Sequence, residues 1–401
     1  MPMDTLHSQP LPLRRIAVVS ETYAPETNGV AHTLSQICRE LRARGTEVDL
    51  VVPRHPARPR GYEPGIHSVA GLPVPSYRGV RCGLVRPRLL TELWRQKRPQ
   101  AIYIATEGPL GLAALRAARR LGIAAVSGLH TRFEAYSDHY ALSGLRPWIR
   151  RYLRHFHNRS AATLVPSPEL ARGLAADGYQ RVQTLSRGVD RRLFHPARRC
   201  PRLREGWRAR EGAPVALYVG RLAAEKNLAL AIAGFRAIQA RQPEARFVLV
   251  GDGPLREALR RAHPDLIFAG PRHGGELARY YASADLFLFP SLSETFGNVT
   301  LEALASGLPV VAFHYAAAAT YITDGRSGRL APLNDEEAWL AAARDLAALA
   351  PTERRAWGQA AREAVGRASW PRIAERFSRI LASAASETTT DPEGVAVCSG
   401  P

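Results

Sequence analysis

The stretch PSLSETFGNVTLEALASGLPVVA, residues 290–312, indicates most clearly the fold class of this chain. It follows one short apolar run, ADLFLF, and leads into another, LPVVAF, and both runs are typical of buried parallel strands. Between them the spacing predicts one short helix, with Leu301 and Leu304 on its buried face and a stop at Gly307. A strand–loop–helix–strand unit places its loop at the carboxyl end of a parallel sheet, where open α/β sheets bind ligands.

Two acids stand in this otherwise mostly apolar and small-residue stretch. Glu294 lies in the loop ahead of the predicted helix, and Glu302 lies on the helix itself. A single glutamate is usually a solvated surface charge. The loop at the edge of a sheet favours a ligand-binding role for this pair instead.

The same strand–loop–helix pattern begins each half of the chain. The first half opens with RRIAVVSETYAPETNGVAHTLSQICRELRARGTEVDLVVP, in which Leu34, Ile37 and Leu41 have helical spacing. The second half opens with PVALYVGRLAAEKNLALAIAGFRAI. A chain of 401 residues exceeds what one core usually supports. We therefore expect an α/β protein with two Rossmann-like domains that face a cleft.

The domain boundaries follow from changes in composition. We expect the first domain at residues 1–190 and an interdomain linker at 191–213, where Arg and Pro accumulate without periodicity. The second domain is expected at 214–368, followed at 369–385 by a helix that crosses back to the first domain. Residues 386–401 are polar and unpatterned, which predicts a disordered tail.

The charge of the chain calls for an acidic partner or another explanation. There are 55 Lys and Arg residues against 36 Asp and Glu, a net charge of +19. Nucleic acid, anionic lipid and phosphate-bearing substrates all fit such a balance. Almost all of the excess is Arg in an Ala-rich sequence, so compositional bias explains part of it, and local clusters are better evidence.

The sequence also indicates the cellular compartment in which the protein is expected. No apolar run reaches the length of a membrane span, and the N-terminus lacks the basic-then-apolar order of a signal peptide. The four cysteines are scattered singly, which fits a reducing compartment. We expect a cytoplasmic protein, either soluble or peripheral on the inner face of the cell membrane.

One local basic cluster is RPWIRRYLRHFHNRS, residues 146–160. It predicts an amphipathic helix that carries Trp148, Ile149, Tyr152, Leu153 and Phe156 on one side and Arg146, Arg150, Arg151, Arg154 and His157 elsewhere. Such a helix can dock on an anionic membrane. It can equally be a core-facing helix with a solvated basic face, and the sequence leaves both interpretations open. Its basic face lacks interleaved stacking aromatics, which disfavours nucleic acid as the partner.

Two loops of the second half carry candidate phosphate ligands. Arg221 and Lys226 directly follow a buried strand, and two cations at the carboxyl edge of a sheet suit a diphosphate. In the next such loop, VGDGP, Gly251 and Gly253 lack side chains and so permit close approach of a ligand. No D-x-D element follows an apolar strand, and we expect neither a metal ion nor a cofactor.

The 290–312 stretch completes this site. The N–H groups at the start of its helix, those of Phe296, Gly297, Asn298 and Val299, would point at the diphosphate. Glu302 could then accept hydrogen bonds from ribose hydroxyls, and Glu294 would face a sugar beyond the phosphates. The set predicts a site for a nucleoside-diphosphate sugar, which acts as co-substrate.

Five motifs together resemble those of the family 4 retaining glycosyltransferases of the GT-B fold. They are GRLAAEKNL, VGDGP and the E-x7-E element ETFGNVTLE in the second half, with ETYAPETNGVAHTL and SRGVDRRLFHP in the first. The resemblance spans nearly the whole chain. It implies that the donor binds mainly to the second domain, that the acceptor binds to the first, and that the cleft closes between them.

The resemblance also implies residue roles. Arg221 and Lys226 would bind the donor diphosphate, Glu302 the ribose and Glu294 the transferred sugar. In the first domain, Gly29 would lie at a helix N-terminus near the phosphates. His130 would contact the sugar near its reacting carbon. The catalytic set is thus His130, Glu294, Arg221 and Lys226. Asn28 departs from the pattern, since many relatives have glycine there.

The finer assignment rests on HTRFEAYSDHY and SRGVDRRLFHP. These motifs are similar to those of bacterial GDP-mannose-dependent α-mannosyltransferases and their lipid glycosyltransferase relatives. We expect transfer of mannose from GDP-mannose to a lipid-linked or membrane acceptor, with no metal ion. A diacylglycerol glycosyltransferase that uses UDP-glucose or UDP-glucuronate is the alternative. A GT-B nucleotide-sugar epimerase, which also cleaves the sugar–phosphate bond, is the other enzymatic rival.

Overall fold

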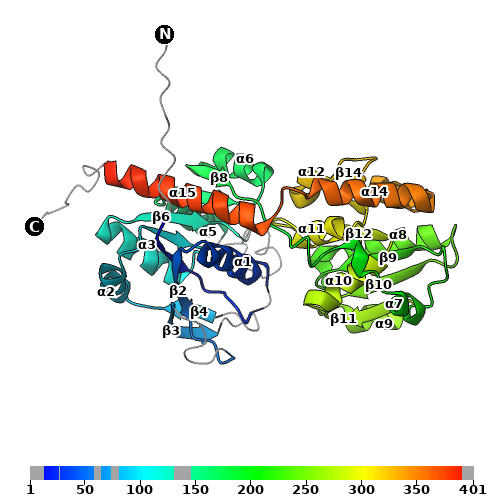
Figure 1. The fold of residues 1–401 in the computed structure, drawn as a ribbon, viewed down its shortest axis with the longest axis horizontal. Helices are drawn as coiled ribbons and strands as arrows, with labels where there is room; N and C mark the ends of the chain where they lie inside the picture. Colours follow the sequence, from blue (N-terminus) through cyan, green and yellow to red (C-terminus); the bar gives the residue numbers. More distant parts are fainter. Residues whose placement is uncertain (1–12, 27, 58–64, 74–80, 131–145, 391–401) are drawn as a thin grey trace, which may run out of the picture. The chain divides into compact units, whose positions relative to one another are not determined.

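A computed structural model describes residues 13–26, 28–57, 65–73, 81–130 and 146–390. The chain forms two compact units (Figure 1). Unit 1 holds the residues up to Ser186 together with those from Trp370 onward, and unit 2 holds Arg187–Ser369.

Unit 1 is built on an eight-stranded sheet in the order β4-β3-β2-β1-β5-β6-β7-β8. Its strands are β1 (Arg15–Val19), β2 (Glu47–Pro53), β3 (Ile66–Pro73), β4 (Arg81–Leu84), β5 (Ala101–Ile104), β6 (Ala124–Gly128), β7 (Ala162–Val165) and β8 (Val182–Thr184). Neighbouring strands are parallel except β3 and β4, which pair antiparallel. The strand order reverses between β1 and β5, so the topological switch point lies there.

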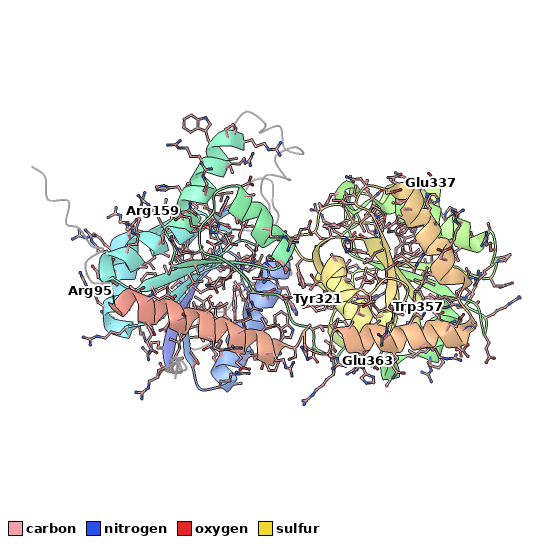
Figure 2. All side chains as sticks on the ribbon, turned by 90° about the horizontal axis from the view of Figure 1, so that it is seen from above. Arg95, Arg159, Tyr321, Glu337, Trp357 and Glu363 are labelled. Atoms are coloured by element: carbon pink, nitrogen blue, oxygen red, sulfur yellow. The ribbon has the colours of Figure 1, made fainter. Side chains whose placement is uncertain are left out.

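Helices cover this sheet. They are α1 (Gly29–Ala43), α2 (Pro87–Lys97), α3 (Pro109–Leu121), α5 (Arg146–Asn158), α6 (Pro168–Ala176) and α15 (Trp370–Thr390). The predicted apolar face of α1 is confirmed, because Leu34, Ile37 and Leu41 are all buried. At the surface of this unit, the side chains of Arg95 on α2 and Arg159 just after α5 are exposed (Figure 2).

Unit 2 is built on a six-stranded sheet in the order β11-β10-β9-β12-β13-β14, parallel throughout. Its strands are β9 (Val215–Val219), β10 (Arg246–Val250), β11 (Ile267–Gly270), β12 (Leu286–Phe289), β13 (Val310–Phe313) and β14 (Gly328–Ala331). This is the strand order of a Rossmann sheet, with its switch point between β9 and β12. The predicted α/β class with two Rossmann-like domains is confirmed.

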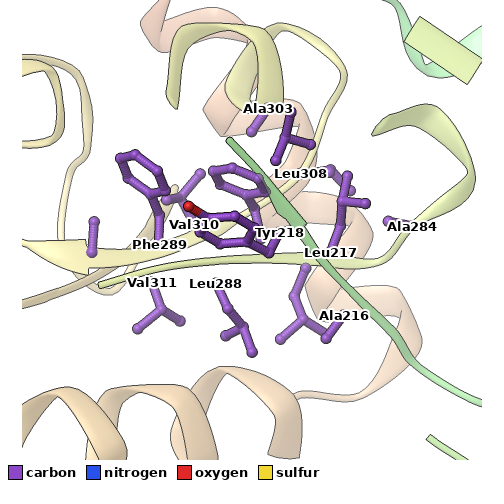
Figure 3. Packing of buried hydrophobic residues seen from close by; sticks show 14 of the residues in the cluster. Ala216, Leu217, Tyr218, Ala284, Leu288, Phe289, Ala303, Leu308, Val310 and Val311 are labelled. Carbon is purple, nitrogen blue, oxygen red and sulfur yellow. The ribbon is translucent and has the colours of Figure 1, made fainter. Parts of the chain in front are cut away.

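The helices of unit 2 follow the same alternation. They are η2 (Pro196–Arg198), α7 (Pro201–Gly206), η3 (Ala224–Lys226), α8 (Leu228–Gln239), α9 (Arg256–Ala262), α10 (Gly274–Ser283), α11 (Asn298–Ala305), α12 (Ala316–Tyr321), α13 (Glu336–Ala348) and α14 (Pro351–Ala364). The strands carry side chains alternately to the two faces. Tyr218 and Phe289 lie on one side of the sheet, and Leu288 and Val311 lie on the other (Figure 3). Burial of both faces explains why the strand sequences are continuously apolar.

The segment expected as a linker is an ordered part of unit 2. Residues 191–213 contain η2 and α7, and Arg199 and Arg204 both pair with Asp285, at 2.7 and 2.9 Å. The same carboxylate accepts a hydrogen bond from the Val215 N–H at 2.8 Å. Charged anchors therefore hold this segment, and that is why it shows no apolar periodicity.

The C-terminal helix α15 packs on the core of unit 1. Trp370, Phe377 and Leu381 are buried in the core that also holds residues of β1, β5 and α1. The helix continues to Thr390, so residues 386–390 are helical where a disordered tail was expected. Ala382 and Ala384 are buried, so the packed face continues to the last turn that was expected. The rest of the expected tail, 391–401, lies outside the described residues.

Candidate active site

The loops after β9 and β12 flank the switch point of unit 2, where a parallel sheet binds its ligand. The structure brings together Lys226 from the first loop and Glu294 from the second. Lys226 Nζ lies 2.5 Å from Glu294 Oε1, and the two side chains are only 15% and 16% exposed. This contact joins two of the residues that the sequence singled out, across 68 positions of the chain.

Lys226 is unusual in its chemistry as well as its place. The sequence contains 55 Lys and Arg residues, and Lys226 and Lys97 are its two lysines. In a chain that uses arginine almost everywhere, position 226 carries a compact ammonium, which differs from a guanidinium in shape and in the hydrogen bonds that it donates. The small charge lies between Glu294 and Ser291, whose Oγ is 3.4 Å away.

Two further residues hold Glu294 and were missed by the sequence analysis. Ser291 Oγ donates to Glu294 Oε1 at 2.8 Å, and Ser291 is almost fully buried. The Tyr315 hydroxyl accepts a hydrogen bond from the Glu294 N–H at 3.0 Å and donates to the Ser291 carbonyl at 2.6 Å. The Glu294 loop is therefore fixed by its own serine and by a tyrosine that follows β13. No motif spacing points to Tyr315, because its contact is tertiary.

Arg221 lies beside this cluster but is held loosely. Its side chain is 53% exposed, and its guanidinium is 3.7 Å from Glu225. A pair so exposed contributes little, so an incoming phosphate can replace it. Nearby, the Tyr218 hydroxyl donates to the Arg221 carbonyl at 3.1 Å. Burial raises the pKa of Tyr218 well above its usual range, and the charges of Glu294 and Glu225 add to the effect.

The start of α11 presents backbone N–H groups at the same edge. Gly297 adopts a left-handed conformation, with φ of 94°, and no side chain caps the helix. The first N–H groups of α11, those of Asn298 and Val299, are the kind of donors that bind phosphate oxygens. Phe296 has a different role. Its ring is buried against Tyr321, and its carbonyl accepts from the Ala317 N–H.

Glu302 lies one turn further along α11, partly buried. The Tyr281 hydroxyl donates to Glu302 Oε2 at 3.0 Å. Burial raises the pKa of the Glu302 carboxyl from about 4.5 to about 7, although the Tyr281 hydrogen bond favours the ionised form. Burial likewise raises the pKa of Tyr281 well above its usual range. Glu302 is thus a strong hydrogen-bond acceptor whose charge is not compensated by a cation in these contacts.

Backbone packing explains why residues 251 and 253 are glycines. A Cβ on Gly251 would lie 1.9 Å from the Gly220 carbonyl oxygen, and a Cβ on Gly253 would lie 2.4 Å from that of Leu222. The loop after β10 therefore packs directly on the loop that carries Arg221. These glycines support the shape of the site through backbone packing, a role that the sequence analysis did not foresee.

The two residues expected from the first domain lie in unit 1. His130 follows β6 and is partly buried, with its Nε2 2.8 Å from the Tyr103 hydroxyl. The rest of the HTRFEAYSDHY motif, residues 131–140, lies outside the described residues. Gly29 is the first residue of α1, and Asn28 is its N-cap. The Asn28 side chain accepts from the N–H groups of Val30 and Ala31, so its departure from glycine has a structural function.

A buried polar cluster in unit 1 was also missed. His157, on α5, is fully buried, although the helical pattern placed it on the basic side. Its Nδ1 lies 2.8 Å from Ser127 Oγ, and its Nε2 lies 3.2 Å from Glu107 Oε1. The Tyr152 hydroxyl donates to the Glu107 carbonyl at 2.5 Å. These contacts tie α5 to the loop after β5 and to β6. The helical pattern of the sequence could not reveal that His157 has polar partners in the interior.

Among the residues that the structure describes, no group of three or more His, Cys, Asp or Glu is placed to hold a metal ion. No helix within the same ranges combines the length and apolarity that a membrane span requires.

Comparisons with known proteins agree with the fold and with the family motifs. The profile described as "Glycosyltransferase Family 4" matches residues 27–193, and that described as "Glycosyl transferases group 1" matches residues 213–348. A structure of HepE from Anabaena in complex with UDP and glucose has the same fold, with a TM-score of 0.71 at 18% identity. That match covers 92% of this chain and all of the other. Two Rossmann-like units of this kind define the class of GT-B glycosyltransferases.

The sequence relatives are more specific. A GDP-mannose-dependent alpha-mannosyltransferase of Mycobacterium tuberculosis is 35% identical over 90% of this chain and 95% of its own length. An alpha-monoglucosyldiacylglycerol synthase of Streptococcus pneumoniae is 29% identical over 74% of this chain and 70% of its own. The chain belongs to glycosyltransferase family 4, as the motifs indicated, and it is a glycosyltransferase.

Proposed function

We propose that the protein transfers mannose from GDP-mannose to a lipid-linked acceptor, with retention of anomeric configuration and without a metal ion. The observation that carries this proposal is the Lys226–Glu294 pair beside the uncapped start of α11. A cation and free N–H groups suit a diphosphate, and a fixed carboxylate next to them suits sugar hydroxyls. The names of the mycobacterial and streptococcal relatives support GDP-mannose and a lipid acceptor.

In this proposal the charged groups act on the leaving group. Lys226, Arg221 and the N–H groups of α11 stabilise the negative charge that grows on the diphosphate as the sugar–phosphate bond breaks. Glu302 binds the ribose hydroxyls, and Glu294 binds the hydroxyls of the mannose. Gly251 and Gly253 keep the neighbouring loop close.

The chemical step is a substitution on one face of the sugar. The acceptor hydroxyl oxygen forms a bond to the anomeric carbon while the bond from that carbon to the phosphate oxygen breaks. The departing phosphate takes the acceptor's proton, and GDP leaves. The donor is a co-substrate, and the reaction needs no further cofactor.

The test is a thermal-shift panel of GDP-mannose, UDP-glucose and UDP-glucuronate. A ligand that binds only the native state stabilises it by about 2.7 kcal/mol at a hundred times its Kd, so the true donor raises Tm most. We expect GDP-mannose to do so. A larger shift with a UDP-sugar would replace this proposal with the UDP-dependent diacylglycerol glycosyltransferase.

Two assays test the other parts of the proposal, which are metal independence and sugar transfer rather than epimerisation. Transfer of mannose to a lipid extract should continue in EDTA, and complete loss that magnesium or manganese restores would overturn metal independence. NMR of the donor without acceptor should show intact or hydrolysed GDP-mannose. An epimerised nucleotide sugar would favour the epimerase instead.

A further inference from the structure

Tyr281, on α10, is fully buried, and its hydroxyl meets α11. The hydroxyl donates to Glu302 Oε2 at 3.0 Å, and the same oxygen lies 3.5 Å from the Val299 carbonyl oxygen in the first turn of α11. Among the residues that the structure describes, Glu302 accepts this hydrogen bond through Oε2 and none through Oε1. The contact therefore fixes one oxygen of the carboxylate and leaves the other for a ligand.

The ring of Tyr281 is itself held by two buried aromatic residues. The Phe194 ring meets it edge-on, with the ring centroids 5.6 Å apart and an interplanar angle of 83°. The Phe287 ring, on β12, lies at a centroid distance of 5.8 Å in a tilted arrangement. Aromatic pairs in such geometries attract each other beyond the effect of the area that they bury. The position of the Tyr281 hydroxyl is therefore determined by the packing of its ring.

Phe194 belongs to the motif SRGVDRRLFHP, and a local turn gives it this position. The Asp190 carboxylate accepts from the N–H groups of Arg192 and Leu193, each at 2.9 Å. The Phe194 N–H donates to the Asp190 carbonyl at 2.8 Å. An aspartate that binds the backbone N–H two residues ahead is typical of a turn. The motif thus forms a compact turn that ends in a ring packed on Tyr281.

Arg362, on α14, joins this turn to the end of α11. Its guanidinium donates to the carbonyls of Arg191 and Phe194, at 3.2 and 3.1 Å. It also donates to the carbonyl of Ala305, the last residue of α11, at 2.5 Å. One rigid planar group therefore binds both the turn that carries Phe194 and the helix that carries Glu302.

We propose that Tyr281 is a positioning residue for nucleotide binding and that the turn of the SRGVDRRLFHP motif supports it. Tyr281 holds the Glu302 carboxylate in the orientation that accepts hydrogen bonds from both ribose hydroxyls, so the site selects a ribonucleotide. A glutamate side chain otherwise samples several rotamers, and fixing one of them before the ligand arrives lowers the entropic cost of binding. The inference rests on the proposed function, since it takes Glu302 as the ribose ligand.

A purely structural role for Tyr281 makes a different prediction. A buried hydroxyl needs a hydrogen-bond partner, and Glu302 supplies one whether or not a nucleotide binds. Loss of the hydroxyl would then lower the stability of the protein, and any loss of affinity would be the same for every nucleotide. The positioning role requires instead that the loss is confined to nucleotides that carry ribose hydroxyls.

The experiment uses calorimetry of the full chain to measure the Kd of GDP and of dideoxy-GDP, which lacks both ribose hydroxyls. The parent should bind GDP at least about tenfold more tightly than dideoxy-GDP. Tyr281→Phe keeps the ring and should bind GDP about tenfold more weakly than the parent, with the Kd of dideoxy-GDP changed less than about twofold. Phe194→Leu should show the same selective loss at about threefold, because the edge-on contact with the Tyr281 ring is lost.

Two controls separate positioning from stability. Tyr280→Phe removes a hydroxyl from the neighbouring buried residue of α10 and should bind both nucleotides like the parent. The double variant Tyr281→Phe, Glu302→Gln should bind GDP no more weakly than Glu302→Gln alone, because two residues that act through one contact are not additive. Equal weakening with both nucleotides in Tyr281→Phe, unchanged GDP binding, or an additive loss in the double variant would each overturn the proposal.

UDP and dideoxy-UDP, measured in parallel, distinguish this proposal from the proposed function. If the parent binds UDP more tightly than GDP, the proposed donor is wrong, and a selective loss within the UDP pair still supports the role of Tyr281. A parent that binds each nucleotide and its dideoxy form equally would refute the ribose contact of Glu302, and the positioning role with it. Should Tyr281→Phe fail to fold, as judged by its Tm, Phe194→Leu decides the question.

Discussion

The switch points of the two sheets have the same topology but differ in the cations that their loops carry. In unit 2, the loops at the switch carry Arg221 and Lys226, and the nearby start of α11 has no side-chain cap. In unit 1, the loops after β1 and β5 carry Glu21 and Glu107 instead. A parallel sheet thus offers a ligand site by its topology, and the side chains decide whether an anion can use it.

In unit 1 the protein's own carboxylate occupies the place of an anion. Glu21 Oε1 accepts from the Leu110 N–H in the first turn of α3, at 3.2 Å. A Cβ on Gly108, the residue before α3, would lie 2.0 Å from Glu21 Oε2, so the carboxylate fills the space at the helix start. Burial raises the pKa of Glu21, and the charge of Glu107 adds to the effect. A phosphate would meet two acids here, whereas the same edge of unit 2 carries two cations, Arg221 and Lys226, beside its acids Glu225 and Glu294.

The largest expected effect comes from removing the cation in unit 2. Lys226→Ala should lower kcat/KM on the order of 10²- to 10³-fold, because a charge that stabilises the leaving diphosphate is lost. Lys226→Arg keeps the charge but should still lower kcat/KM at least about tenfold, since a planar guanidinium places its donors differently from the compact ammonium beside Glu294. Steady-state kinetics measure both, and Lys97→Ala is the control. Near-normal turnover in either Lys226 variant would contradict this prediction. The difference in cations between the two switch points would then have no catalytic meaning.

The next effect concerns the loop that shapes the cationic site. Gly251→Ala should lower the free energy of unfolding by roughly 3 kcal/mol or more, because its Cβ would overlap the Gly220 carbonyl and its φ is 137°. Chemical denaturation measures this. Gly275→Ala is the matched control, since nothing lies within 4 Å of its added Cβ. A Gly251→Ala protein of normal stability that has lost donor affinity would favour direct ligand approach at this glycine instead.

The third effect depends on pH. Glu302 has a pKa of about 7 in the folded chain and an ordinary value near 4.5. Between these values the folded state holds a proton that the unfolded state has lost, so ionisation of Glu302 destabilises the fold as pH rises from 4.5 to 7. Glu302→Gln should therefore be more stable than the parent at pH 8, by roughly 1 to 3 kcal/mol, and similar to it at pH 4.

The same variant tests the ribose role. Binding of GDP should be weaker in Glu302→Gln than in the parent at pH 8, because the ionised carboxylate is the better acceptor for two hydroxyls. Urea denaturation and isothermal titration calorimetry at both pH values supply the data. An equal stability difference at pH 4 and pH 8 would show that Glu302 titrates near its ordinary pKa. Unchanged GDP affinity would contradict its contact with the ribose.

The smallest effect comes from a residue that only positions Glu294. Tyr315→Phe removes the hydroxyl between the Glu294 N–H and the Ser291 carbonyl, and kcat/KM should fall about tenfold, the cost of one hydrogen bond to an active loop. The loss should appear in kcat, with little change in Tm. Tyr280→Phe, a buried tyrosine of α10, is the control. If a lower Tm accounts for the whole decrease in kcat/KM, Tyr315 has a structural role only.

The sequence was sufficient for the fold because local signals and tertiary packing agree. Ser167 and Pro168 begin α6 as a cap and a first-turn proline should, and Leu301 and Leu304 are buried on α11. The Lys226 and Glu294 loops could be placed because a strand end fixes a loop's position in a parallel sheet. The roles of the individual site residues remain predictions.

What the sequence could not supply depends on contacts between distant segments. Tyr315 acts on Glu294 from a different loop, and His157 is buried because it meets Ser127 and Glu107. Helical periodicity grouped Trp148 with Phe156, but a sheet covers only part of a long helix. The ordered segment at 191–213 was missed because arginine pairs, rather than apolar residues, anchor it.

The position of α15 has a consequence for synthesis on the ribosome. Unit 2 is one continuous segment, Arg187–Ser369, whereas the core of unit 1 needs Trp370, Phe377 and Leu381 from the far end of the chain. The first domain to be translated is therefore the last to be completed, which reverses the usual N-terminal-first order. Until α15 emerges, the apolar surface that it covers stays open, and nascent chains stalled before Trp370 should recruit chaperones through unit 1 while unit 2 is already folded.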